Sequence, residues 1–217
     1  MARLVAFDMD GVLADCPSSW VHVHKHFKVS NDQSLYEYLR GEIDDLEFIS
    51  RDIRLWMRKE PGITADRIDE LLSDVPLMPG ARETIKQLRG AGFKTAIVSA
   101  GIDLLAERIS RELSIDLHYA NGFVTDAEGR LTGEGVLKVR LMDKGDAVTA
   151  AAHAVGADMK DIVSVGNSRY DIPMFERSSF GIAFYPSDPE VKKQADAVVK
   201  EKDLAGILKF IDTRARR

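Results

Sequence analysis

The sequence predicts an α/β protein: a doubly wound, mainly parallel, Rossmann-like sheet, with a small helical cap inserted after the first strand and a β-hairpin. Three observations predict this fold. Short apolar runs alternate with longer amphipathic segments along most of the 217 residues. No strand-like run appears between Asp15 and Pro79. Residues 123–132 have the pattern of two strands around an acidic, glycine-containing turn.

The apolar runs are short and bounded by turn or charged residues, as is typical of buried parallel strands. They cover residues 4–7, 95–98, 162–165, 180–184 and 197–199. In the segments between them, apolar side chains recur at helical spacing, as Ala81, Ile85 and Leu88 do. The expected helices cover residues 80–89, 103–113, 143–155, 173–177, 189–195 and 204–213.

The segment that follows the first strand interrupts this alternation. It contains helix-like pieces near residues 18–27, 45–58 and 65–73. We therefore expect a catalytic core of residues 1–14 and 79–217 and a helical cap of residues 15–78. Because ligands bind at the carboxyl ends of strands in such a sheet, a cap in this position would cover the site and exclude water.

The composition excludes several classes of protein. The formal net charge is −5, which argues against a general nucleic-acid binder, so the basic residues 214–217 are interpreted as a helix end. Cys16 is the single cysteine and can form no internal disulfide. No apolar stretch approaches the ~20 residues that span a bilayer, and no signal-peptide pattern is present. We expect a cytoplasmic monomer or homodimer without a nucleic-acid or membrane partner.

Reactive side chains follow the predicted strands where each strand ends. They are Asp8, Asp10 and Gly11; Ser99, Ala100 and Gly101; Asn167 and Asp171; and Lys144 at the start of a helix. These groups should meet at one edge of the sheet. Acids, a hydroxyl group, a lysine and glycines are the inventory of a site for a hard cation and a phosphoryl group. One acid can attack phosphorus while the other exchanges a proton with the leaving oxygen and with water.

Four ordered segments carry a resemblance to a known family. They are Asp8-Met9-Asp10-Gly11-Val12-Leu13, Val98-Ser99-Ala100-Gly101, Lys144 and Gly166-Asn167-Ser168-Arg169-Tyr170-Asp171. In this order they resemble the signatures of the haloacid-dehalogenase-like phosphatases, and within that superfamily the phosphoserine-phosphatase-like group. The resemblance covers nearly the whole chain.

The resemblance implies a Mg²⁺-dependent phosphatase and a role for each site residue. Asp8 would form an aspartyl phosphate and bind Mg²⁺, and Asp10 would protonate the leaving group and bind the ion through its backbone carbonyl. Ser99 and backbone amides near Ala100 and Gly101 would hold phosphoryl oxygens, with Gly11 beside them. Lys144 would neutralise charge on Asp8 and the phosphoryl group, and Asp171 would orient or directly ligate the metal.

Two positions depart from the family. The family usually has an acidic metal ligand where this chain has Asn167, which still offers an oxygen but with one less negative charge. The phosphoserine enzymes usually carry an asparagine where this chain has Tyr170, and the bulkier residue would reshape the pocket.

The residues that select the substrate are less clearly indicated. The phosphoserine enzymes use a glutamate after the first strand loop, where this chain has Asp15-Cys16-Pro17, and an arginine in the cap, near Arg51 and Arg54. Both arginines are candidates for substrate binding. The expected partner is a small phosphorylated metabolite: phosphoserine, phosphoglycolate or another small phosphate. The alternative is a non-catalytic phosphate-binding regulatory protein in which Asn167 marks decay of the site.

Three histidines suggest a metal site that the pattern does not support. His22, His24 and His26 lie in one expected helix, where only His22 and His26 share a face and no acid completes a ligand set. We interpret this segment as a solvated or core helix face. Cys16 has no paired histidine or second cysteine for thiol chemistry.

Overall fold

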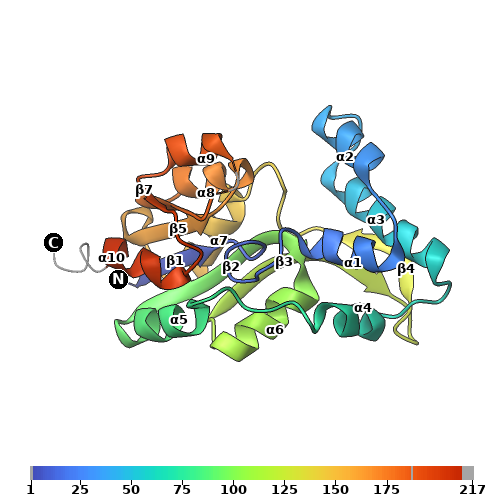
Figure 1. The fold of residues 1–217 in the computed structure, drawn as a ribbon, viewed down its shortest axis with the longest axis horizontal. Helices are drawn as coiled ribbons and strands as arrows, with labels where there is room; N and C mark the ends of the chain where they lie inside the picture. The colour runs from blue at the N-terminus through green and yellow to red at the C-terminus, as the bar shows by residue number, and fades with distance from the viewer. Residues whose placement is uncertain (1, 187, 212–217) are drawn as a thin grey trace.

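The computed structural model in Figure 1 describes residues 2–186 and 188–211. Within these residues the centre is a seven-stranded sheet in the order β4-β3-β2-β1-β5-β6-β7. β4 is antiparallel to β3, and all other neighbours are parallel. The strands are β1 (Arg3–Phe7), β2 (Phe93–Ile102), β3 (Leu117–Thr125), β4 (Leu131–Val136), β5 (Ile162–Gly166), β6 (Phe180–Phe184) and β7 (Ala197–Val199). The predicted doubly wound, mainly parallel sheet is therefore confirmed.

Alternate side chains of β1 pack on opposite faces of the sheet. Val5 and Phe7 belong to the hydrophobic cluster that includes α5, α6, η3 and α10, whereas Leu4 and Ala6 belong to the cluster that includes α7, α8 and α9. These helices are α5 (Ala81–Gly90), α6 (Asp103–Leu113), α7 (Gly145–Val155), α8 (Ile172–Glu176), α9 (Pro189–Gln194), η3 (Leu204–Ile207) and α10 (Leu208–Ile211). Because both faces are covered, the central strands are continuous apolar runs.

Three elements differ from the expected ones. β2 extends beyond residues 95–98 at both ends, and β3 begins before the expected hairpin, where polar residues such as His118 and Asn121 obscure the strand pattern. The helix expected over 204–213 is divided into η3 and α10, and residues 212 and 213 lie outside the described part of the chain, as do the basic residues 214–217. Short 3₁₀ turns, η1 (Met159–Asp161) and η2 (Arg169–Asp171), flank β5.

The insert after β1 contains α1 (Ser19–Phe27), α2 (Asp32–Leu39), α3 (Asp45–Lys59) and α4 (Ala65–Leu72). α2 is an additional helix that was not expected from the sequence, and Tyr38 is its one buried residue. Trp20 and Ile53 of these helices belong to the same hydrophobic cluster as Val5 of the sheet, so the core and cap boundaries stay a prediction. None of the helices in the described residues is long and apolar enough to cross a membrane.

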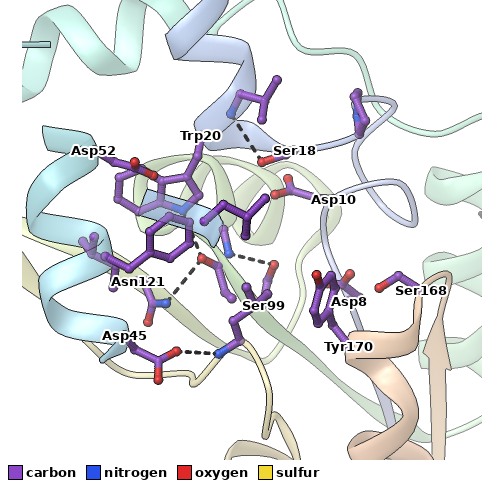
Figure 2. Close-up of a pocket in the computed structure, with 18 of the residues that line it drawn as sticks. Asp8, Asp10, Ser18, Trp20, Asp45, Asp52, Ser99, Asn121, Ser168 and Tyr170 are labelled. Atoms are coloured by element: carbon purple, nitrogen blue, oxygen red, sulfur yellow. Dashed lines mark hydrogen bonds between the residues drawn. The ribbon is translucent and has the colours of Figure 1, made fainter. Parts of the chain in front are cut away.

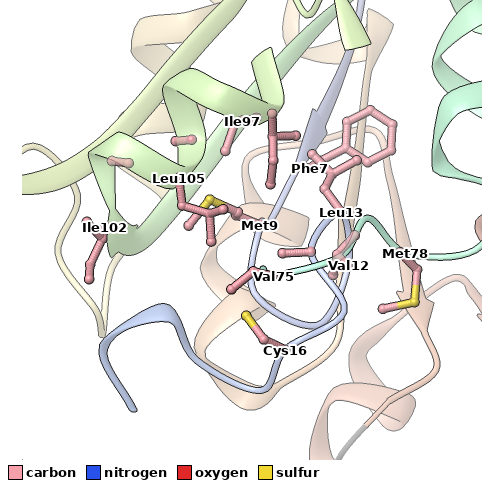
Figure 3. Packing of buried hydrophobic residues seen from close by; sticks show 14 of the residues in the cluster. Phe7, Met9, Val12, Leu13, Cys16, Val75, Met78, Ile97, Ile102 and Leu105 are labelled. Atoms are coloured by element: carbon pink, nitrogen blue, oxygen red, sulfur yellow. The ribbon is translucent and has the colours of Figure 1, made fainter. Parts of the chain in front are cut away.

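The loop after β1 is held in place by its own apolar side chains (Figure 3). Met9, Val12 and Leu13 are completely buried. The carbonyl oxygen of Met9 accepts hydrogen bonds from the backbone N–H groups of Val12, Leu13 and Ala14, at 3.1, 2.9 and 2.9 Å. Because the residues around them are fixed, Asp8 and Asp10 are placed at a defined position at the end of β1.

Candidate active site

Most of the predicted site residues line a cavity of about 430 Å³ at the carboxyl edge of the sheet: Asp8, Asp10, Ser99, Ala100, Gly101, Lys144 and Asn167. Figure 2 shows Asp8, Asp10 and Ser99 near one another on one side of this cavity. They come from the ends of β1 and β2, and Lys144 immediately precedes α7. Parallel strands bring these distant segments together because their carboxyl ends meet at one edge.

Lys144 joins two of the buried acids. Its Nζ donates to Asp171 Oδ1 at 2.7 Å and contacts Asp8 Oδ1 at 2.9 Å. The side chains of Lys144 and Asp8 are at most 5% exposed, and Asp171 is completely buried. Burial opposes the positive charge of Lys144, but Asp171 and Asp8 outweigh it and raise the lysine pKa above its ordinary value. Lys144 therefore remains a cation beside Asp8.

Asp171 acts on the site through its neighbours. Its Oδ1 accepts from Lys144, and its Oδ2 accepts from the backbone N–H groups of Asn167 and Ser168 at 2.8 and 2.9 Å and from Ser168 Oγ at 3.2 Å. Both oxygens are therefore engaged by donors of the protein. Asp171 therefore positions Lys144 and the turn after β5, and its expected role of orienting or directly ligating a metal stays a prediction.

Asp8 lies in a site with an excess of negative charge. Burial raises the pKa of Asp8 to about 7, and the repulsion from Asp171 adds to this effect while Lys144 opposes it. Asp8, Asp10 and Asp171 share one lysine among the described residues that line the cavity. A divalent cation would remove this imbalance and favour the ionised Asp8.

Asp10 is held at the beginning of α1. Its Oδ2 accepts from the backbone N–H and the hydroxyl group of Ser19, both at 2.9 Å, and Cys16 Sγ donates to its Oδ1 at 3.7 Å. Burial raises the pKa of the Asp10 carboxyl, while the bonds from Ser19 oppose this shift. A carboxyl group with a raised pKa is suited to give a proton to a leaving oxygen. Ser19 has no signal in the sequence, where it reads as part of an ordinary helix start.

The end of β2 approaches Asp10 closely. A Cβ atom on Gly101 would lie 2.7 Å from Asp10 Oδ2 and 2.6 Å from Met9 Cε, so this position requires glycine. Ser99 Oγ accepts from the backbone N–H of Gly101 at 3.1 Å. The carbonyl oxygen of Ala100 accepts from Trp20 Nε1 at 3.0 Å, which joins this strand to α1.

Asn167 lies against the loop that carries the two aspartates. Gly11 has φ +77°, and a Cβ atom added to it would lie 2.1 Å from Asn167 Nδ2. The expected ligands, the Asp8 carboxylate, the Asp10 backbone carbonyl and the Asn167 side-chain oxygen, are all oxygen donors, the ligand type that Mg²⁺ prefers. No group of three His, Cys, Asp or Glu side chains placed to hold a metal exists in residues 2–186 and 188–211. The histidines of α1 therefore form no such site, and His24 is a buried core residue.

The structure does not bring Arg51 and Arg54 into the cavity lining. Arg51 forms ion pairs with Glu37 and Glu47, and Arg54 lies 3.5 Å from Glu47. The face of α3 that lines the cavity carries residues 45, 48, 49 and 52. Both arginines fall outside this helical spacing, so the cavity lining does not support their expected contact with substrate, which stays a prediction.

The residues that replace them on the cavity wall were not identified in the sequence as site residues. They are Trp20 and Val21 of α1, Asn31, Leu35 of α2, Asp45, Phe48, Ile49 and Asp52 of α3, and Leu141. The spacing of positions 45, 48, 49 and 52 was the available signal, but it mixes acids with apolar residues and does not read as an apolar stripe. Tyr170, the second departure from the family, also lines the cavity.

Comparisons with known proteins agree with this geometry. A family model of haloacid dehalogenase-like hydrolases matches residues 5–176. The chain is 30% identical over 210 residues to the phosphoserine phosphatase of Archaeoglobus fulgidus, covering 94% of this chain and 58% of that protein. It is 35% identical over 162 residues to the phosphoserine phosphatase of Methanocaldococcus jannaschii, covering 71% of this chain and 75% of that protein.

A similar solved structure is that of a phospho-aspartyl intermediate analogue of a phosphoserine phosphatase. It has a TM-score of 0.80 and 26% identity, and covers 96% of this chain and 98% of that one. A substrate-bound phosphoserine phosphatase has a TM-score of 0.81 and 25% identity, with coverage of 97% and 98%. The described elements are therefore arranged as in these phosphatases.

Proposed function

This chain belongs to the haloacid dehalogenase-like hydrolases, and on that basis we propose that it is a phosphatase that hydrolyses a small phosphomonoester through an aspartyl phosphate on Asp8. The observation that carries the proposal is the contact of Lys144 Nζ with both Asp8 and Asp171, at 2.9 and 2.7 Å. This contact places a fixed cation beside the carboxylate that would attack phosphorus.

The reaction has two steps. An Asp8 oxygen attacks phosphorus as the bond from phosphorus to the leaving oxygen breaks, and Asp10 gives its proton to that oxygen. Asp10 then takes a proton from water as the water attacks phosphorus, which releases phosphate and regenerates Asp8. Lys144 remains beside the phosphoryl group in both steps, and Ser99 and the backbone near Gly101 offer donors to its oxygens.

Mg²⁺ would be held by the Asp8 carboxylate, the Asp10 backbone carbonyl and the side-chain oxygen of Asn167. When bound, it supplies positive charge that reduces the repulsion between the acids and a phosphate dianion. Asp171 contributes by fixing Lys144 and the turn that carries Asn167.

Phosphoserine is one candidate substrate, since the similar proteins described above are named for it. Phosphoglycolate is another candidate, because Arg51 and Arg54 do not supply an amino-acid contact in the cavity. The assembly state, monomer or homodimer, and the cytoplasmic location stay predictions from the sequence.

The test is release of phosphate from p-nitrophenyl phosphate with and without Mg²⁺. We expect Mg²⁺-dependent hydrolysis, and we expect Asp8→Asn to reduce it by at least about 10⁴-fold, because the nucleophile is lost while the side-chain shape is kept. Asp146→Asn is the control, since that side chain is 65% exposed at the start of α7. Circular dichroism checks that each variant is folded.

A non-catalytic phosphate-binding protein is the second candidate, because Asn167 replaces an acid in the proposed metal site. Such a protein would bind inorganic phosphate by calorimetry but would not hydrolyse the aryl phosphate at any Mg²⁺ concentration. Near-normal activity of Asp8→Asn would instead contradict the proposed nucleophile.

A further inference from the structure

The wall of the cavity opposite Asp8 carries two acidic side chains and, within the described residues, no basic one. In Figure 2, Asp45 and Asp52 of α3 lie across the cavity from Asp8, with Trp20 close to Asp52. Phe48 and Leu35 add apolar surface to this wall. Lys144 is the only basic side chain among the described residues that line the cavity, and it is engaged with Asp8 and Asp171.

Asp52 is a buried carboxylate with incomplete pairing. The residue is 3% exposed. Its Oδ2 accepts from Asn31 Nδ2 at 3.0 Å, but its buried Oδ1 accepts no hydrogen bond. His24 Nε2, which also has no hydrogen-bond partner in the described part of the chain, lies 3.5 Å from this Oδ1. In residues 2–186 and 188–211, no lysine or arginine forms an ion pair with Asp52.

His24 does not supply the missing positive charge. Its Nδ1 lies 2.7 Å from Trp56 Nε1, which can only donate. Nδ1 is therefore the acceptor, and the single ring proton is on Nε2, which makes the imidazole neutral. Burial of a carboxylate without a cation is costly, so the uncompensated negative charge of Asp52 favours a positively charged ligand in the cavity.

Asp45 places a second carboxylate on the same face of α3. Its Oδ1 accepts from the Tyr38 hydroxyl at 3.0 Å and from the Leu141 backbone N–H at 2.8 Å, which fixes its position. Seven residues separate Asp45 from Asp52, so the two carboxylates are about 10 Å apart along the helix axis. The cap wall therefore presents negative charge along the length of the cavity.

We propose that the leaving group of the substrate carries an ammonium group and no carboxylate, as in a small aminoalkyl phosphate. This inference rests on the proposed function, which places the phosphoryl group at Asp8 and the leaving alcohol against the cap wall. Asp52 attracts the ammonium group, and Trp20 and Phe48 add aromatic surface to the same cavity lining. A carboxylate at the same place meets two acids and no cation, which disfavours phosphoglycolate and phosphoserine.

The test compares kcat/KM of the full chain for four phosphates that differ in charge. O-phosphoethanolamine has an ammonium group, ethyl phosphate lacks it, phosphoserine adds a carboxylate, and phosphoglycolate has only the carboxylate. We expect phosphoethanolamine to exceed ethyl phosphate by at least about tenfold, which corresponds to one favourable charge contact of ~1.4 kcal/mol. We also expect it to exceed phosphoserine, with phosphoglycolate lowest.

The variant Asp52→Asn removes the charge and keeps the shape. We expect the ratio of kcat/KM for phosphoethanolamine to that for ethyl phosphate to fall about tenfold, towards one. Glu47→Gln is the matched control, because Glu47 is on the same helix, pairs with Arg51 and Arg54, and does not line the cavity. Its ratio should equal that of the wild type. If Asp52→Asn does not fold, the same kcat/KM ratio is measured for Asp45→Asn. This variant also removes one negative charge from the cap wall, at a less buried position, and its ratio should fall as well.

Two results overturn the inference. One is a wild-type enzyme that prefers phosphoserine or phosphoglycolate to phosphoethanolamine. The other is an unchanged charge ratio in folded Asp52→Asn. Failure of the wild type to hydrolyse p-nitrophenyl phosphate is a different outcome, because it refutes the phosphatase assignment itself, whereas hydrolysis without the charge preference refutes only the proposed substrate class.

Discussion

The two ends of the cavity are built differently. At the sheet end, Asp171 receives four donors and Asp10 receives two bonds from Ser19, on segments that buried strands hold in place. At the cap end, Asp52 has one hydrogen-bond donor, and its other, buried oxygen has only the neutral His24 ring nearby, at 3.5 Å. A fully satisfied network fixes geometry for one type of chemistry, whereas the cap end keeps a negative charge that no lysine or arginine of the described residues neutralises.

The difference separates two properties that are usually discussed together. The sheet end determines whether a phosphate ester is hydrolysed, since it contains the nucleophile, the proton donor and the lysine. The cap end determines which alcohol leaves, since it contacts the part of the substrate that does not react. Variants at the sheet end should therefore change the rate for all substrates. Variants at the cap end should change which substrate has the highest kcat/KM.

The largest expected loss of activity among the variants that test this division into two ends is at Asp10. Asp10→Asn should reduce kcat by about 10²–10⁴-fold, because it removes the proton donor and keeps the acceptor geometry. The reduction should be of similar size for charged and uncharged alkyl phosphates. Steady-state kinetics on both kinds of substrate measures it. A reduction confined to ammonium substrates would show that Asp10 belongs to the selecting wall, and the division into two ends would be wrong.

Substitutions of Asn167 should have a smaller effect, on the Mg²⁺ concentration that the enzyme needs, and they test whether the sheet end binds the metal. Since Mg²⁺ binds more tightly as ligand charge increases, Asn167→Asp should lower the Mg²⁺ concentration for half-maximal activity by about tenfold and keep kcat at saturating metal. Asn167→Leu, which offers no oxygen, should lose most Mg²⁺-dependent activity. Titration of the three proteins with Mg²⁺ decides this. An unchanged midpoint in Asn167→Asp would mean that Asn167 does not contact the ion.

Charge at the sheet end should also reduce stability when metal is absent. Burial raises the pKa of Asp8 from the ordinary 3.8 to about 7 in the folded protein. Its contribution to the free energy of unfolding is therefore complete below about pH 4 and is lost as the pH rises through 7. In EDTA, Asp8→Asn should thus gain stability relative to wild type between pH 5 and 8, with Tm higher by about 2–4 °C for each kcal/mol.

Thermal unfolding at several pH values measures this difference. Asp146→Asn, at an exposed site, should follow the wild-type profile. If the Tm difference between Asp8→Asn and wild type does not change with pH, Asp8 is ionised at low pH in the metal-free protein and the charge imbalance described for the site is wrong.

The residues at the sheet end could be predicted from the sequence, whereas those of the cap wall could not. Asp8 and Ser99 directly follow apolar runs, and Asn167 follows one after a single glycine, so their meeting at one edge of a parallel sheet follows from the strand pattern alone. Lys144 could be identified only by its order in the chain relative to the other signatures. Whether Asp171 ligates a metal or positions Lys144 could not be decided, because that depends on where its two oxygens point.

The cap wall was not predictable in the same way. Arg51 and Arg54 were expected to face the substrate because they lie near the correct place in the chain, but side-chain direction on a helix changes by about 100° per residue. Asp52 is identified as a wall residue only when the packing of α3 against β4 is known. Residues on a helix that packs against a distant strand depend on tertiary contacts, and the local sequence does not contain that information.

Cys16 lies beside Asp10 at the sheet end and gives the smallest expected effect. It is 7% exposed and donates to Asp10 Oδ1 at 3.7 Å. Burial and the negative charge of Asp10 raise the pKa of the thiol, so it remains protonated near pH 7 and is a weak nucleophile. Cys16→Ser keeps a donor of similar size, and kcat/KM should stay within about twofold of wild type because the proton of Asp10 remains the catalytic one.

Alkylation with iodoacetamide should be slow at pH 8 for the same reason, and any inhibition should reflect the bulk of the added group beside Asp10. Cys16→Val, which has no donor, separates the hydrogen bond from the space that the side chain fills. If Val is a few-fold less active than Ser, the contact with Asp10 contributes to the proton donor. If Ser is inactive while folded, thiol chemistry contributes to catalysis, and the sheet end would contain a second reactive group that neither the geometry nor the sequence pattern assigns.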